Sequence, residues 1–274
     1  AFAPESEYYA ETDEDAEEYR CQYLKSAYEK LNFSEMRFYN YDKSLNSTDD
    51  RVAYGIANKT ISVNNTDWTL FAVQVRGGGY AGEWASNLNI TPYDIGGTKY
   101  SVGFGKPAEE IYNTLNESLK LLSAGTDGKK KVKIWISGFS RGAAVSNVLA
   151  GELTKHADEL GLNTSSIYAY TFATPNAVLI NSDEDVEAGY ENIHNTLNPC
   201  DIVPAVPMSV PWFGWNYSKY GTTHYYNYTG FTEGERSEIS EKYKDLTGLW
   251  YDPYVGWWYV ENGTINHAYS GFIP

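Results

Sequence analysis

The chain has 274 residues and a formal net charge of −15, and 42% of its residues are hydrophobic and 16% aromatic. This is enough for one large or two small domains with a buried core. The acidic charge argues against nucleic acid as a partner and against adsorption on anionic membranes. The chain contains no run of about twenty apolar residues, so we expect no transmembrane helix and no stable membrane insertion.

Apolar side chains recur along most of the chain with the spacing of helices or strands. We expect an acidic, flexible lead over residues 1–16, followed by a single domain over residues 17–274. The expected elements are, in order, a helix over 17–31, strands over 52–57, 60–63 and 68–75, a helix over 107–123, a strand over 131–137, a helix from 143, a strand over 166–173, a short helix over 184–189 and a strand over 191–197. This alternation predicts an α/β fold with a mostly parallel central sheet and helices on both faces.

The pentapeptide around Ser140 is the most informative motif. It reads Gly138-Phe139-Ser140-Arg141-Gly142, with a strand-like run before it and a small-residue helix start after it. A nucleophile elbow of the G-x-S-x-G type requires this strand–turn–helix context. The flanking glycines leave room for the backbones that approach a strained serine. We therefore predict that Ser140 is a catalytic nucleophile rather than an ordinary helix N-cap.

A serine hydroxyl needs a histidine to accept its proton and a carboxylate to orient that histidine. The chain has four histidines. His156 lies on the predicted elbow helix and His194 inside a predicted strand, so both fit poorly. His267, near the C-terminus, is favoured as the base, with His224 as the alternative. In α/β hydrolases the chain order is serine, acid, histidine, so the acid is expected between Ser140 and the catalytic histidine.

Asp201 is the favoured acid, because it directly follows a predicted strand. The acidic cluster at residues 183–185 competes with it but reads better as a solvated helix start. An oxyanion hole needs two backbone N–H donors. The residue after the nucleophile, Arg141, supplies one, and the glycines at 77–79 that end an earlier strand are candidates for the second.

The two cysteines, Cys21 and Cys200, match no metal-binding spacing, and their pairing as a disulfide is left open. Residues 1–4 do not resemble a signal peptide, so the chain is consistent with a mature form whose targeting segment has been removed. We expect an extracellular or cell-surface location. The oligomeric state is left open.

In the order of its motifs, the chain resembles the class 3 lipase family of α/β hydrolases. The resemblance covers roughly residues 68–271. Its motifs are the strand Phe71–Val75 with Arg76-Gly77, Trp84, Gly97-Thr98-Lys99, Gly103-Phe104, the elbow, Tyr170-Thr171-Phe172-Ala173-Thr174-Pro175, Asp201-Ile202-Val203-Pro204 and His267-Ala268-Tyr269.

Carried onto these positions, the resemblance implies Ser140, Asp201 and His267 as the triad and the backbone of Gly78 and Arg141 as the oxyanion hole. It also implies a lid over residues 79–92, with Tyr80 and Trp84 as its large side chains. The elbow pentapeptide departs from the family pattern, which often has His before the serine and Leu after it. The Gly-Phe-Ser-Arg-Gly-Ala sequence is also similar to that of the phospholipase effectors of bacterial secretion.

We therefore expect a serine carboxylic-ester hydrolase that works through an acyl-enzyme and needs no metal or organic cofactor. Its substrate is expected to be a small-molecule or lipid ester. The predicted lid, residues 79–88, offers little apolar surface to an oil interface, which favours short, medium or soluble esters. The alternatives are a phospholipase-type serine hydrolase and a non-catalytic α/β-hydrolase-like binding protein.

Overall fold

The computed structural model describes residues 16–41, 50–78, 89–180, 186–198, 201–207, 215–225, 248–252, 256–261 and 264–265. The chain divides into two compact units, each described here by itself. The first comprises residues 1–196 and 203–224, and the second residues 197–202 and 225–274. The expectation of a single domain over residues 17–274 stays a prediction.

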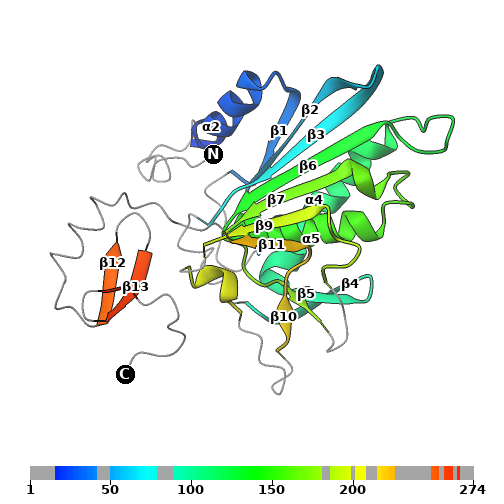
Figure 1. The fold of residues 1–274 in the computed structure, drawn as a ribbon. Coiled ribbons are helices and arrows are strands. Elements are labelled where there is room, and N and C mark those ends of the chain that lie inside the picture. The colour runs from blue at the N-terminus through cyan, green and yellow to red at the C-terminus, as the bar shows by residue number, and fades with distance from the viewer. Residues whose placement is uncertain are drawn as a thin grey trace. The chain divides into compact units, whose positions relative to one another are not determined.

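A seven-stranded mixed sheet organises the first unit (Figure 1). In spatial order its strands are β1 (Ser34–Tyr39), β2 (Tyr54–Val63), β3 (Thr66–Val75), β6 (Val132–Phe139), β7 (Ile167–Phe172), β9 (Ile193–Leu197) and β11 (Thr222–Tyr225). β1, β2 and β3 pair antiparallel, whereas β3, β6, β7 and β9 pair parallel. The predicted α/β class is confirmed, with a parallel centre inside a mixed sheet.

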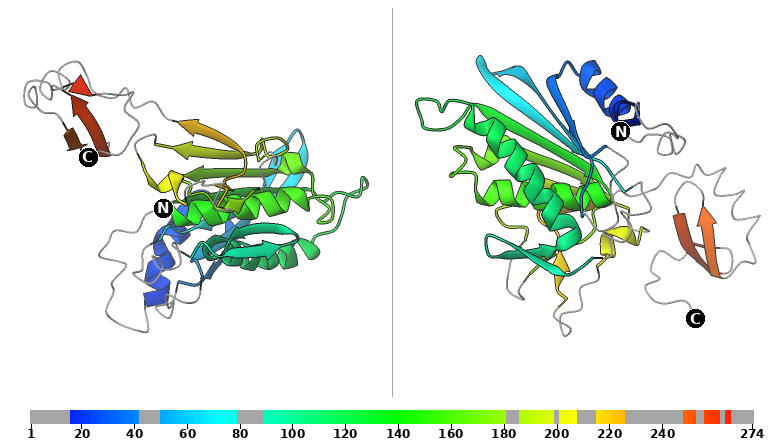
Figure 2. Two further views of the ribbon diagram at one scale, coloured as in Figure 1. Left: turned by 90° about the horizontal axis from the view of Figure 1, so that it is seen from below. Right: turned by 180° about the vertical axis from the view of Figure 1, so that it is seen from behind.

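Helices cover both faces of this sheet, as predicted. They are α2 (Ala16–Lys30), α4 (Val102–Lys120) and α5 (Arg141–Lys155). Figure 2 shows α4 and α5 on one face and α2 near the antiparallel edge. Among the described residues, no helix combines the length and the apolar character needed to cross a membrane.

The alternation of side chains along the strands explains this layering. Ile134 and Ile136 of β6 point into the large core shared with α4 and α5. The intervening Trp135 packs with Tyr28 of α2 on the other face. The Tyr28 hydroxyl donates to the carbonyls of Gly55 and Ala72, at 2.9 and 3.2 Å, and so ties α2 to β2 and β3. Burial raises the pKa of Tyr28.

Two small sheets and two short 3-10 helices complete the described structure. The first sheet contains, in order, β10 (Tyr217–Ser218), β8 (Val178–Leu179), β5 (Thr98–Ser101) and β4 (Pro92–Ile95), and the 3-10 helices are η1 (Thr164–Ser166) and η2 (Val203–Ala205). The second unit contains an antiparallel sheet of β12 (Gly248–Asp252), β13 (Gly256–Glu261) and β14 (Thr264–Ile265).

The interruption predicted between the strands over 52–57 and 60–63, a turn at Asn58–Lys59, is wrong. These two residues continue β2 and pair with Phe71 and Leu70 of β3. The chain reverses instead at Asn64 and Asn65, whose φ values are 51° and 58°. Two successive positive φ angles are the geometry of the hairpin turn that fits twisted strands, and asparagine tolerates them better than most residues do.

The predicted short helix over residues 184–189 is also absent where the structure describes it, because residues 186–189 form bends and a turn that ends at Gly189, with φ 87°. A left-handed glycine ends a local turn rather than extending a helix.

Candidate active site

Ser140 lies at the tip of a strained elbow between β6 and α5. Its backbone has φ 53° and ψ −124°, outside the regions that residues with a side chain normally occupy. The elbow is fixed by hydrogen bonds from Ser140 N to Phe172 O at 2.9 Å and from Ala143 N to Ser140 O at 2.8 Å. A non-glycine residue held in this conformation by its surroundings is typical of a functional site.

The two glycines of the motif are required by close backbone approaches. A Cβ atom on Gly138 would lie 2.3 Å from the carbonyl oxygen of Gly142. A Cβ atom on Gly142 would lie 2.5 Å from the carbonyl oxygens of Val75 and Arg76. Both distances are shorter than any side chain tolerates, so the steric reason expected for these glycines is present in the structure.

The loop after β3 lies against the elbow. Arg76 N donates to Ala53 O at 2.9 Å, and a Cβ atom on Gly77 would lie 3.1 Å from Phe139 O. Gly78 is exposed and is the last described residue of this loop. The segment in which we expect the second oxyanion donor is therefore packed beside the first turn of α5, whose N-terminal N–H groups favour a negative charge.

Arg141, the other expected backbone donor, has a buried side chain. Its exposed fraction is 1%, its Nη2 donates to Arg51 O at 3.1 Å, and its guanidinium carbon lies 5.9 Å from the centre of the Phe104 ring. This burial was not predicted from the sequence, because arginine is usually exposed. The leucine that the class 3 lipase family often has at this position was the available signal, because leucine is typical of buried sites.

Three of the four histidines lie in the described structure, and all three are distant from Ser140. His156 follows α5 by one residue, sixteen residues after Ser140, which corresponds to about 24 Å along a helix. His194 lies on β9, two strands from β6, or about 10 Å across the sheet. Its register, through Tyr170 of β7, aligns it with Ser137, three residues before Ser140. His224 lies on β11, three strands from β6, or about 14 Å across the sheet.

His194 and His224 contact each other instead. Their Nδ1 and Nε2 atoms are 3.1 Å apart, and the His194 ring stacks on Tyr170 with centroids 5.2 Å apart. Burial, and secondarily the neighbouring His224, lowers the pKa of His194. The pair lies on β9 and β11, at one edge of the sheet, so the position of His224 does not favour it as the catalytic base.

The remaining predicted site residues are placed only in part. Asp201 follows β9, is half-buried, and its N–H donates to Asn198 O at 3.1 Å. It belongs to the second unit. His267, Tyr80 and Trp84 lie outside the described residues.

The sequence left the pairing of the two cysteines open. Cys21 is buried near Tyr41 and Ala53, whereas Cys200 lies outside the described residues. The pairing of Cys21 with Cys200 stays open.

Two aromatic side chains flank the elbow on the sheet face opposite α4 and α5. Phe139 precedes the serine directly and is aligned with Phe172 of β7, and the two are 40% and 43% exposed. Apolar rings beside a nucleophile offer contact surface to the apolar part of an ester. The sequence showed Phe139 as a departure from the family pattern but did not show its pairing with Phe172.

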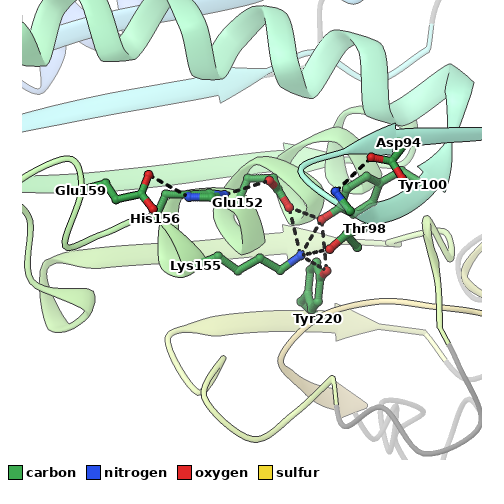
Figure 3. A network of polar contacts seen from close by, with 9 residues as sticks. Asp94, Thr98, Tyr100, Glu152, Lys155, His156, Glu159 and Tyr220 are labelled. Atoms are coloured by element: carbon green, nitrogen blue, oxygen red, sulfur yellow. Dashed lines mark hydrogen bonds and ion pairs between the residues drawn. The ribbon is translucent and has the colours of Figure 1, made fainter.

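A second polar cluster lies at the other end of α5 (Figure 3). Lys155 Nζ donates to the hydroxyls of Tyr220 at 2.7 Å and Tyr100 at 2.9 Å, and to Glu152 Oε1 at 3.0 Å. Tyr100 also donates to Glu152. Burial raises the pKa of Tyr100, with Tyr220 and Glu152 adding to the effect. This network ties α5 to β5 and to the segment before β11, so we assign it a structural role.

The strand, strained serine, close-packed glycines and adjoining loop define an elbow of the α/β-hydrolase type. The family model described as lipase (class 3) matches residues 72–210, about half of the chain. The protein therefore belongs to the class 3 lipase family. No curated protein matches the sequence.

Solved structures of fungal lipases are similar to the chain. A fungal lipase–inhibitor complex has 20% sequence identity and a TM-score of 0.45, and the match covers 69% of this chain and 66% of that one. The triacylglyceride lipase of Rhizomucor miehei has 19% sequence identity and a TM-score of 0.44, and the match covers 70% of this chain and 66% of that one. Another fungal lipase has 16% sequence identity and a TM-score of 0.48, and the match covers 74% of this chain and 67% of that one. The chain thus spans slightly less than two thirds of the length of the first two.

Proposed function

We propose that the protein is a serine hydrolase of carboxylic esters. The observation that carries the proposal is the backbone of Ser140, which is held at φ 53° and ψ −124° between two glycines that admit no side chain. Membership of the class 3 lipase family supports the same reaction. We infer that the whole protein acts on ester substrates, and that it needs no metal or organic cofactor.

In the proposed mechanism, Ser140 Oγ attacks the ester carbonyl carbon while His267 takes the hydroxyl proton. Asp201 orients His267 and stabilises its protonated form. The backbone N–H groups of Gly78 and Arg141 stabilise the negative oxygen of the tetrahedral intermediate. The carbon–oxygen bond to the alcohol then breaks, and His267 protonates the leaving alcohol. A water molecule, deprotonated by His267, releases the acid from Ser140.

The positions of the described histidines support His267 as the base. His156 is at the far end of α5, and His194 and His224 are paired across the sheet. None of the three needs a catalytic role to account for its contacts. Since a serine hydrolase of this class requires a histidine, the remaining one is the best candidate.

A fluorophosphonate probe tests the nucleophile. We expect it to label the protein, and we expect Ser140→Ala to abolish both labelling and hydrolysis of p-nitrophenyl butyrate. His267→Ala and Asp201→Asn should lower kcat by at least about 1,000-fold, whereas His224→Ala, the matched histidine control, should keep it. Retention of a tenth of the activity in Ser140→Ala would exclude the triad. Absence of labelling in the intact protein would favour the non-catalytic binding alternative.

For the substrate, we propose short, medium or soluble esters rather than emulsified triglyceride. Tyr80 and Trp84 are the large side chains of the proposed lid, and apolar burial is worth about 25 cal/mol per Å², so opening such a lid onto oil gains only a few kcal/mol. Phe139 and Phe172 supply a limited apolar surface beside the serine. This area suits a short acyl or alcohol group.

A chain-length series of p-nitrophenyl esters, a triglyceride emulsion and phosphatidylcholine vesicles separate the substrate classes. We expect kcat/KM to be highest for the short and medium esters. A rate increase above the solubility limit of a long-chain ester would indicate interfacial activation instead. Faster release of fatty acid from phosphatidylcholine would favour the phospholipase alternative. We also propose an extracellular or cell-surface location, which cell fractionation tests.

A further inference from the structure

A cavity of about 470 Å³ that is open to solvent lies at the start of β6, the end of the strand remote from Ser140. Its lining includes Lys129, Lys130, Lys131 and Lys133, together with Trp68 from β3. The volume is within the range of about 300–1,000 Å³ that is usual for small-molecule sites. The eight residues of β6 separate this cavity from the elbow by about 25 Å, so it is distinct from the proposed ester site.

The cavity reverses the charge of the protein locally. Its lining residues include four lysines and one acidic residue, Asp127, in a chain whose net charge is −15. Of these lysines, Lys129 forms an ion pair with Asp158, whose side chain is 94% exposed. Repulsion by the remaining acidic surface is screened beyond about 8 Å at physiological salt. A small anion inside the cavity therefore experiences mainly the lysines.

Two of the lysines are held in place by neutral acceptors. Lys130 Nζ donates to Leu160 O at 2.6 Å, and Lys133 Nζ donates to the Tyr168 hydroxyl at 3.1 Å. An ammonium group has three donors, so each of these bonds leaves donors for a ligand. Because the flexible side chains are already ordered, an anion that binds here pays less of the usual entropy cost. Lys131 is exposed at the rim.

The rest of the lining suits a sugar rather than a bare ion. Trp68 contributes an indole ring, with Lys133 Nζ 4.9 Å from the ring centre. Asn64, Asn163 and Ser165 add amide and hydroxyl groups. Such groups hydrogen-bond to sugar hydroxyls, while ammonium groups bind carboxylates or sulfates.

We propose that this cavity binds a short acidic oligosaccharide, one whose sugar rings carry carboxylate or sulfate groups. A duplex nucleic acid is too large to enter a pocket of this volume. The site holds the protein on an acidic glycan and leaves the elbow end of the sheet accessible. The proposal does not depend on the proposed esterase function.

Isothermal titration with trigalacturonate tests the site on the full chain. We expect saturable binding, at least ten-fold weaker in Lys131→Glu, with Lys131→Gln intermediate. Lys25→Glu makes the same charge change on α2, outside the cavity lining, and should bind like the unchanged protein. Urea unfolding verifies that each variant is folded. Trp68→Phe should weaken binding while leaving the lysines in place.

Maltotriose, inorganic phosphate, sulfated disaccharides and a DNA duplex complete the design. Binding of trigalacturonate or the sulfated sugar, with at least ten-fold weaker binding of maltotriose and phosphate, supports the proposal. Phosphate binding of equal strength overturns the sugar component, and tighter DNA binding overturns the ligand class. Absence of saturable binding, or an equal loss in Lys25→Glu and Lys131→Glu, overturns the site.

Discussion

Replacing Gly142 by alanine adds a single methyl group at the point where the elbow meets the loop after β3. That methyl carbon would lie 2.5 Å from the carbonyl oxygens of both Val75 and Arg76, whereas real Cβ contacts are essentially never shorter than 3.0 Å. The carbonyls must therefore retreat by at least 0.5 Å, or the first turn of α5 must move. Neither contact is with a flexible side chain, so the strain cannot be relieved by a rotamer change.

Two effects of opposite sign set the magnitude. Alanine is favoured over glycine in a helix interior by about 0.5–1 kcal/mol. Overpacking against rigid surroundings costs about 1–3 kcal/mol, and more where backbone must shift. Because two backbone carbonyls are involved here, we expect the overlap to dominate and Gly142→Ala to lower the free energy of unfolding by about 2 kcal/mol.

The effect on catalysis should be larger than the effect on stability. The displaced residues are Arg76 and its neighbours, which lead to the proposed oxyanion donor Gly78. A displacement approaching 1 Å near the reacting atoms can reduce the rate by about 100-fold. We expect kcat/KM for p-nitrophenyl butyrate to fall by about that factor, together with the rate at which a fluorophosphonate labels Ser140.

Gly97→Ala is the matched control. Gly97 has φ 91° and no atom within 4 Å of an added Cβ, so this substitution strains the backbone without any overlap. We expect a loss of about 1 kcal/mol and unchanged activity. Urea unfolding and steady-state kinetics on both variants measure the difference. The steric reasoning is refuted if Gly142→Ala unfolds within 0.5 kcal/mol of the unchanged protein (a difference on the order of ordinary surface substitutions) and retains its kcat/KM.

Three further outcomes are expected. Arg141→Leu should lower kcat more than it raises KM, because the side-chain bond to Arg51 O that fixes the donor residue is lost; Arg141→Lys should recover part of kcat, and equal kinetics in both variants would contradict this. Lys155→Met should lower the free energy of unfolding by about 3 kcal/mol, because it removes the ammonium group paired with the buried Glu152 carboxylate. The double variant with Glu152→Gln should recover part of this loss, and no recovery would contradict the pairing. Burial lowers the pKa of Lys219 from 10.5 to about 8, so between these pH values the unfolded chain binds more protons than the folded one. The free energy of unfolding should therefore rise with pH across that window, relative to that of Lys219→Met. A difference between the two proteins that stays flat or falls from pH 7 to 10 would contradict this.

Local sequence was sufficient to predict several elements and the position of the candidate nucleophile. The strand before Ser140, the helix after it and the helix ending at Lys120 all have periodic apolar side chains, and the structure contains all three. Gly138 was predicted for a steric reason that acts within the elbow itself, its close approach to the backbone of Gly142. Such features depend on contacts between near neighbours, which a linear pattern records.

Only the tertiary structure decided the features that depend on distant segments. The turn after β2 was misplaced because pairing with β3 overrides the turn preference of Asn58. The burial of Arg141 depends on Arg51, ninety residues earlier. The pairing of His194 with His224 required β9 and β11 to become neighbours in the sheet. The sequence determined which residues have the chemistry for ester hydrolysis, whereas long-range strand pairing decided which histidines lie away from the serine, because periodicity does not specify which strands become neighbours.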